Sequence, residues 1–288
     1  MALKAGVRQG GILSPTLFAL YVDEILVKLE RSHLGCRIRG LFLGAFMYAD
    51  DLLLAAISLS DLQEMIRICQ IELENIEMLV NADKTMCLRV GSQFAVNCVS
   101  LQLNQMPLKW AQTIRYLGIY FLASKSFKIC MDEARKKFFI SSNSILSKVG
   151  TEQVGVVLSL INSFCVPILT YALESVHLCK SERVRLDNPY TMVFHKLFGT
   201  YSKSIIQDCQ KFCGYLPLSY FVDLKTLRFL RKMSDVHLVN NVVHHLFEYF
   251  GRIDFWNIAA RYNINLTDSN ELLKRKVWTA FVNSIVPS

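Results

Sequence analysis

The chain has 288 residues, of which 52% are hydrophobic and 19% are charged. This length allows one large domain or two modest ones, and the apolar content is enough for a substantial buried core. The mean hydropathy of +0.29 is high for a soluble protein, so it favours either a membrane protein or a piece of a larger assembly. The formal net charge of +8 suits a polyanionic partner without specifying one.

The longest apolar stretch, residues 155–176, is long enough to cross a bilayer. It is interrupted by Ser159, Asn162, Ser163, Pro167 and Glu174. It also lacks an aromatic belt and basic flanks. We therefore expect a buried helix pair broken at Pro167 and no membrane span. Residues 1–6 have no continuous apolar segment and are not expected to be a secretory signal.

The nine cysteines are scattered along the chain. Most lie within apolar runs, as Cys69, Cys87 and Cys165 do, which is typical of reduced core thiols and of an intracellular, reducing compartment. Nucleus and cytoplasm are equally compatible with this pattern.

A zinc site is the alternative for one group of residues. Cys209 and Cys213 have a permitted ligand spacing, and three histidines follow at His237, His244 and His245. The rest of the set matches no compact metal pattern, so buried thiols are favoured there.

The first predicted element is a helix with Ser14 as its N-cap and Pro15 in its first turn. Apolar residues recur at helical spacing over residues 17–29, and the helix is expected to end at residues 33–35. Two short apolar runs follow, at residues 41–47 and 52–57. They predict a buried hairpin with an acidic pair at its turn.

Ser60 and Gln63 have the spacing of a capping box, and they open a second predicted helix with apolar residues at helical spacing over residues 62–80. Further strands are expected at residues 85–90, 99–103, 107–110 and 113–120, the middle two as a small hairpin. From residue 127 the apolar spacing becomes helical and stays so. The predicted fold class is α+β, mixed for roughly the first 124 residues and all-α afterwards.

The acidic pair Asp50-Asp51 stands between apolar residues. Two adjacent carboxylates repel each other, and burial of unpaired charge is costly, so the pair predicts a bound cation. Hard oxygen ligands favour Mg²⁺, which one or two carboxylates and substrate phosphates commonly hold. Taken by itself, the Asp-Asp dipeptide has an alternative interpretation: an exposed turn between two strands that binds no cation.

Four motifs in order support the cation reading: residues 6–18 (GVRQGGILSPTLF), 48–51 (YADD), 81–85 (NADKT) and 116–118 (YLG). Their order and spacing resemble the reverse transcriptases of non-LTR (LINE-type) retrotransposons. Residues 143–146 and 163–174 resemble the same branch more loosely. The resemblance is strong over residues 6–120 and fair to about residue 176, and the residues beyond are unassigned.

The resemblance implies an RNA-directed DNA polymerase that transfers nucleotides by a two-metal mechanism. RNA template, DNA primer and deoxynucleotide triphosphates would be its partners, with two Mg²⁺ ions as cofactors. Asp50 and Asp51 would bind the metals, and Lys84 would act at the leaving pyrophosphate. The residues implied at the nucleotide and template are Gln9, Gly10, Ser14 and Tyr48. Those implied to support the primer are Leu117 and Gly118.

By the same resemblance, residues 1–124 would be an incomplete polymerase palm, an antiparallel sheet with backing helices. Residues 125–180 would be a helical thumb and residues 181–288 a helical C-terminal extension of unknown role. The family's third carboxylate and its fingers would precede residue 6, so the chain is expected to be a truncated copy, inactive alone and prone to self-association through exposed apolar surface.

A catalytically inactive remnant that at most binds template and primer is the alternative function. Its support is a predicted basic helix over residues 125–137, with positive charges at Lys125, Lys128, Arg135, Lys136 and Lys137. These could follow a phosphate backbone. An ordinary solvated face explains the same charges equally well.

Overall fold

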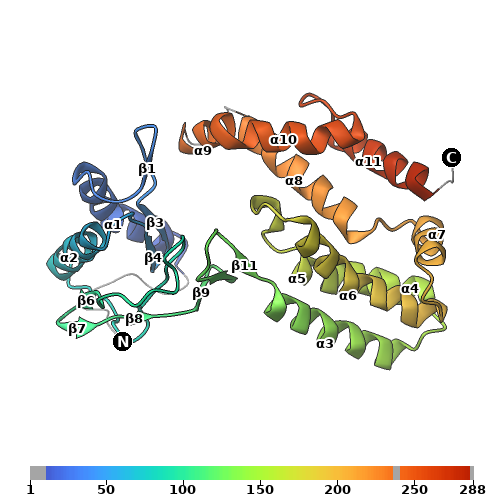
Figure 1. Ribbon diagram of the computed structural model, residues 1–288, viewed down its shortest axis with the longest axis horizontal. Coiled ribbons are helices and arrows are strands. Elements are labelled where there is room, and N and C mark those ends of the chain that lie inside the picture. The colour runs from blue at the N-terminus through green and yellow to red at the C-terminus, as the bar shows by residue number, and fades with distance from the viewer. Residues whose placement is uncertain (1–10, 236–240, 286–288) are drawn as a thin grey trace. The chain divides into compact units, whose positions relative to one another are not determined.

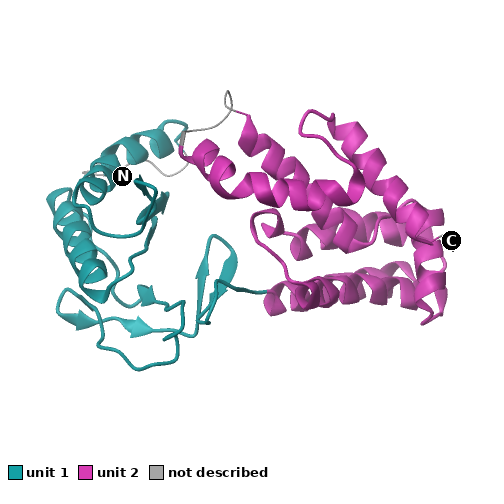
Figure 2. Ribbon diagram, turned by 45° about the horizontal axis from the view of Figure 1, so that its top comes forward, with its two compact units in different colours: residues 1–130 teal, residues 131–288 magenta. Residues whose placement is uncertain are grey.

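The computed structural model describes residues 11–235 and 241–285. The chain divides into two compact units, unit 1 (residues 1–130) and unit 2 (residues 131–288), each considered by itself (Figure 1, Figure 2). Unit 1 consists of α1 (Ser14–Arg31), β1 (Arg37–Ile38), β2 (Leu41–Phe42), β3 (Ala45–Tyr48), β4 (Asp51–Leu54), α2 (Leu59–Asn75), β5 (Met86–Cys87), β6 (Gln102–Leu103), β7 (Met106–Pro107), β8 (Lys109–Trp110), β9 (Thr113–Tyr116), β10 (Ile119–Leu122) and β11 (Ile129–Cys130).

Unit 2 is helical throughout its described residues. Its elements are α3 (Asp132–Val149), α4 (Val154–Leu160), the π-helical turn η1 (Ile161–Cys165), α5 (Val166–Leu169), the 3-10 turn η2 (Leu173–Ser175), α6 (Lys180–Phe198), α7 (Lys203–Cys213), α8 (Leu218–Ser234), α9 (Asn241–Leu246), the π-helical turn η3 (Phe247–Gly251), α10 (Arg252–Ala259), the 3-10 turn η4 (Ala260–Tyr262) and α11 (Asn270–Ile285). The predicted order, mixed α/β and then helical, is confirmed.

Helix α1 begins one residue earlier than predicted. The prediction that Ser14 is the N-cap is wrong, because Leu13 holds that position and makes no side-chain cap. The Ser14 N–H already donates to the Gly11 carbonyl at 3.2 Å, so the chain has turned before Ser14. Pro15 lies in the first turn as expected, where a missing N–H costs nothing.

Helix α2 also begins at a different cap from the one predicted. Ser58, and not Ser60, accepts the Asp61 N–H at 3.0 Å. The Gln63 side chain pairs instead with the backbone of Gln102, donating at 2.9 Å and accepting at 2.7 Å. The glutamine therefore connects the helix to β6 and is not available for a capping box.

Unit 1 has its main core between α1, α2 and the β3–β4 hairpin. The buried residues of this core are Val22, Ile25, Leu29, Met65, Cys69 and Leu73. Beside it, Lys28 Nζ donates to Glu72 Oε2 at 2.5 Å across the two helices. The core and this ion pair fix the two helices behind the hairpin.

The strands of unit 1 form small separate sheets, not the single antiparallel sheet that was predicted. The antiparallel sheets are β1–β2, β3–β4, β6–β7 and β11-β10-β9, while β5 and β8 pair in parallel. Strands of two to four residues supply few interstrand hydrogen bonds. The strand predicted over residues 113–120 is in fact the β9–β10 hairpin, because Leu117 (φ 47°) and Gly118 (φ 84°) reverse the chain.

The apolar stretch at residues 155–176 is helical through Pro167 as far as Leu169, and a turn at residues 170–172 follows. The predicted break at Pro167 is wrong, since α5 runs on to Leu169. The π-helical turn η1 precedes the proline, which lies in the first turn of α5, where no N–H is required. Among the described residues, no helix combines the length and hydropathy that crossing a membrane requires.

The core thiols are buried as predicted. Cys69, Cys87 and Cys165 are inaccessible, and burial raises the pKa of Cys69 to about 12 and that of Cys87 to about 11, the latter with help from Cys98. These thiols stay protonated at neutral pH and are poor nucleophiles.

Candidate functional site: the acidic hairpin of unit 1

The acidic pair lies at the tip of the β3–β4 hairpin, as predicted. Tyr48 pairs with Asp51 across the two strands, which leaves Ala49 and Asp50 as the turn. Ala49 has a left-handed φ of 52°, a conformation that costs an L-residue with a Cβ roughly 1–2 kcal/mol. The turn that carries the two carboxylates therefore has a strained backbone at Ala49, which the packing of the hairpin must maintain.

Both carboxylates are exposed to solvent. The expectation that they sit where water is scarce is wrong, because the apolar residues of β4 turn toward α1 and α2 and leave the tip outside the core. Within the described residues, no hydrogen bond or ion pair neutralises Asp50 or Asp51. The pair thus offers adjacent, uncompensated oxygen ligands.

A second hairpin of unit 1, β9–β10, has its own tip. Tyr116 ends β9, and burial and then the negative charge of Asp51 raise the pKa of its phenol above the ordinary value. The turn that follows, Leu117-Gly118, has positive φ at both residues, which is the backbone of a type I′ turn. Asp51 of the YADD motif thus acts electrostatically on Tyr116 of the YLG motif, although the two motifs are separated by more than 60 residues of sequence.

Lys84 is exposed in the turn that leads to β5. Its N–H donates to Asn81 Oδ1 at 3.1 Å, and the Thr85 hydroxyl donates to the Asn81 carbonyl at 2.8 Å. These bonds fix the backbone of the NADKT motif. No contact between the described residues joins the Lys84 ammonium to either aspartate of the hairpin.

The remaining predicted nucleotide-binding residues divide into two groups. Gln9 and Gly10 lie outside the described residues. Ser14 is half-buried at the start of α1, and Tyr48 is 67% exposed beside the acidic turn. Tyr48 is therefore accessible to a ligand at the hairpin tip.

The donor set fits Mg²⁺ in part. Two exposed carboxylates are what this ion accepts when substrate phosphates and water complete its coordination. Among the described residues, no three His, Cys, Asp or Glu side chains converge as a metal cluster. The predicted zinc alternative has His237 outside the described residues, while Cys209 and Cys213 are half-buried on α7, with thiol pKa values raised mainly by burial.

The predicted basic helix is shorter than expected. Lys125 and Lys128 lie in the connection between β10 and β11, because α3 begins only at Asp132. Arg135 pairs with Asp132 at 3.4 Å, and this ion pair partly neutralises the Arg135 charge. Lys136, Lys137 and Lys148 are exposed cations of α3, and Lys136 pairs with Glu133 at 3.3 Å.

Sequence reasoning missed a buried polar cluster in unit 2. Asp223 is 3% exposed and accepts hydrogen bonds from Arg183, Arg261 and Tyr262. Each of the three donors is 38 to 40 positions from Asp223 in the sequence, and no motif joins them to it. An aspartate within the apolar pattern of α8 was the one signal available.

Two comparisons with known proteins found similarity. Residues 1–121 match the family described as reverse transcriptase (RNA-dependent DNA polymerase). The chain is also similar to the retrovirus-related Pol polyprotein from type-2 retrotransposable element R2DM of Drosophila melanogaster, at 32% identity over 127 residues. This match covers 41% of the chain and 12% of the polyprotein.

The matched residues include all four motifs and both hairpin tips. The Asp50-Asp51 pair lies where the resemblance placed it, at the tip of a β-hairpin. Residues 1–121 of this chain are therefore part of a reverse transcriptase domain related to the Pol polyproteins of non-LTR retrotransposons.

Proposed function

We propose that unit 1 is the metal-binding part of an RNA-directed DNA polymerase palm, with RNA template, DNA primer and deoxynucleotide triphosphates as ligands. The observation behind this proposal is the adjacent, exposed and unpaired Asp50 and Asp51 at a strained hairpin tip. Residues 125–180 would be the thumb and residues 181–288 a C-terminal extension.

In this proposal Asp50 and Asp51 would hold Mg²⁺, which when bound stabilises charge on the attacking and leaving oxygens. Tyr48, Gln9, Gly10 and Ser14 would lie against the nucleotide and template. Lys84 would supply positive charge, and a proton, at the leaving pyrophosphate. Leu117 and Gly118 would support the primer end, because their turn follows Tyr116, whose pKa is raised in part by Asp51.

Primer extension tests this proposal. Two carboxylates are few ligands for a pair of metal ions, so we expect no detectable extension of a DNA primer on RNA by residues 1–288. Joining the chain to the polymerase segment that precedes these motifs in a related element, and that contributes a further carboxylate, should produce synthesis.

In that joined protein, Asp50→Asn should abolish synthesis, while the exposed Asp23→Asn on α1 should not. Synthesis that survives Asp50→Asn would show that the hairpin is not the metal site. Robust synthesis by residues 1–288 alone, lost on Asp50→Asn, would show that another group in the chain completes the metal set.

A non-catalytic template-primer binder is the second candidate function. It is favoured by the exposed Lys136 and Lys137 on α3. Replacing both with Gln should weaken binding of an RNA–DNA duplex for all sequences alike and lower the salt slope by about one to two. The control is Lys274→Gln with Arg275→Gln, which removes the same charge from α11. An equal effect of the control would contradict a specific role for α3.

A further inference from the structure

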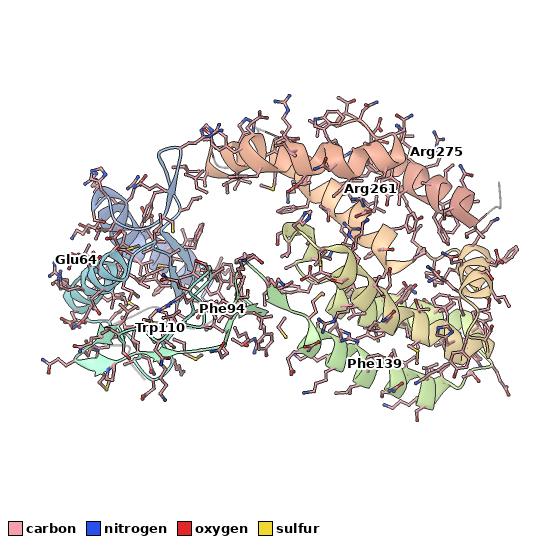
Figure 3. The ribbon with its side chains drawn as sticks, in the orientation of Figure 1. Glu64, Phe94, Trp110, Phe139, Arg261 and Arg275 are labelled. Carbon is pink, nitrogen blue, oxygen red and sulfur yellow. The ribbon has the colours of Figure 1, made fainter. Side chains whose placement is uncertain are left out.

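Three helical elements of unit 2 meet at one buried carboxylate. Asp223 of α8 accepts Arg183 Nη1 of α6 at 2.6 Å, and its other oxygen accepts Arg261 Nη1 at 3.2 Å and the Tyr262 hydroxyl at 2.7 Å, both from η4. Burial and then Asp223 raise the pKa of Tyr262, so its hydroxyl stays a donor. Figure 3 labels Arg261 near α8 and α10.

The cluster pairs two guanidinium groups with one buried carboxylate. Asp187 also acts electrostatically on Arg183, so what the cluster offers a ligand is unused N–H donors. Each guanidinium has five N–H groups. Within the described residues, Arg183 uses a second group on the Leu178 carbonyl at 3.5 Å, and Arg261 makes no further hydrogen bond. Most of these donors remain for water or a ligand.

Both arginines line a cavity of about 600 Å³. This volume lies within the range of small-molecule sites. Lys180 adds a third cation to the lining. Two aromatic rings, Phe229 and Phe250, also line the cavity, and Phe250 is 50% exposed. The cavity therefore combines cationic donors with flat apolar surface.

The acidic groups of the cavity differ in their pairing. The Glu174 carboxylate is 3.0 Å from Lys225 Nζ, and this ion pair neutralises its charge. Asp254 lines the same cavity, as does the amide of Asn257. A carboxylate and an amide beside three cations do not suit a simple anion. They suit a ligand that has hydroxyl or amino donors as well as negative charge.

The wall that contributes Phe250 has an irregular backbone. Phe247–Gly251 forms the π-helical turn η3, and such turns are frequent at functional sites. A Cβ at Gly251 would lie 2.8 Å from Cδ2 of Phe247 and 3.3 Å from Cδ2 of Leu230. The glycine thus lets η3 approach α8, and Phe250 then lies on the cavity wall.

We propose that this cavity binds a nucleotide, with its phosphate on Arg183 and Arg261, its base against Phe229 and Phe250, and its hydroxyl or amino groups on Asp254 and Asn257. The nucleotide could be free or belong to a single-stranded nucleic acid, since both present the same chemistry. This site is separate from the acidic hairpin, and its failure would leave the polymerase proposal unchanged.

Calorimetric titration of the full chain tests this. The probes are adenosine monophosphate, adenosine, inorganic phosphate and a short single-stranded oligoadenylate. The monophosphate should bind saturably and more tightly than adenosine or phosphate. Arg261→Gln and Phe250→Ala should each weaken binding about tenfold or more, because a charge-assisted hydrogen bond or a stacked base is lost. Both side chains are about half exposed, so folding should survive, which circular dichroism checks.

Arg252→Gln is the matched control. Arg252 belongs to α10, pairs with Glu248 at 2.9 Å, and does not line the cavity. Its replacement should leave binding unchanged. Binding of the oligonucleotide but not the monophosphate, with the same response to Arg261→Gln, would identify a strand as the source and support the proposal. No saturable binding by any probe, or equal weakening by Arg252→Gln, would overturn it.

Discussion

Tyr116 and Asp51 illustrate how a charge and a neutral donor coexist at the hairpin tips. Burial is the larger cause of the raised Tyr116 pKa, and Asp51 is the second. A phenol that remains protonated beside a carboxylate is available to donate hydrogen bonds. The proximity could not be predicted from the sequence, since the YLG motif indicated a strand and not what faces it.

Replacing Asp51 with Asn should lower the Tyr116 pKa part of the way to its ordinary value, because burial remains. The measurement is a phenolate absorbance titration of each protein against the same protein with Tyr116→Phe. Since the folded-state pKa lies above the unfolded one, the phenol stabilises the fold below about pH 10, and this contribution is lost as pH rises through the folded value. An unchanged Tyr116 titration in the Asp51→Asn protein would contradict the proximity.

Among the elements, the β3–β4 hairpin was predictable and its conformation was not. Two apolar runs around Asp50-Asp51 indicated the hairpin, but a left-handed Ala49 has no sequence signal. The caps of α1 and α2 were misplaced for a similar reason. At α2 two serines were available, Ser58 and Ser60, and the capping box was excluded by a contact with a distant residue, since Gln63 pairs with Gln102.

Relief of the strained turn has a measurable effect. Ala49→Gly should stabilise the hairpin by about 0.5–1 kcal/mol, because removal of the left-handed penalty exceeds the entropy cost of glycine. Ala45→Gly, in the strand of the same hairpin, is the matched control and should destabilise it by a similar amount. Amide hydrogen exchange of β3 and β4 measures both. Faster exchange in Ala49→Gly would show that the turn is not strained.

For the whole molecule, the division into a mixed and a helical part followed from the change in apolar spacing near residue 127. The buried Asp223 cluster could not be predicted, since it depends on how α6, α8 and η4 pack. The apolar residues of α1 were expected to form one core-facing side, but only some of them are buried. Val22, Ile25 and Leu29 are buried, whereas other apolar residues of the helix and the preceding turn face solvent: Ile12, Leu13, Leu17, Leu20 and Tyr21.

This exposed surface should cause self-association of the isolated chain, because contact between two copies removes contiguous apolar surface from water. Leu17→Gln with Leu20→Gln should shift sedimentation toward the monomer. Ile57→Gln with Leu79→Gln removes two even more exposed apolar side chains elsewhere in unit 1 and should not shift it. A wild-type chain that sediments as a monomer at all concentrations would contradict this expectation.

Because Gly251 has no Cβ, the backbone at residue 251 can lie close to Phe247 and to Leu230 of α8. A single methyl group there would meet the Phe247 ring at 2.8 Å and Leu230 of α8 at 3.3 Å, so one of these side chains or the helix itself would have to move. The chain continues from this glycine through α10 to Arg261, whose bond to Asp223 is already 3.2 Å long. A displacement of a few tenths of an ångström at residue 251 would therefore lengthen the ion pair between Arg261, ten residues later, and the buried Asp223 carboxylate.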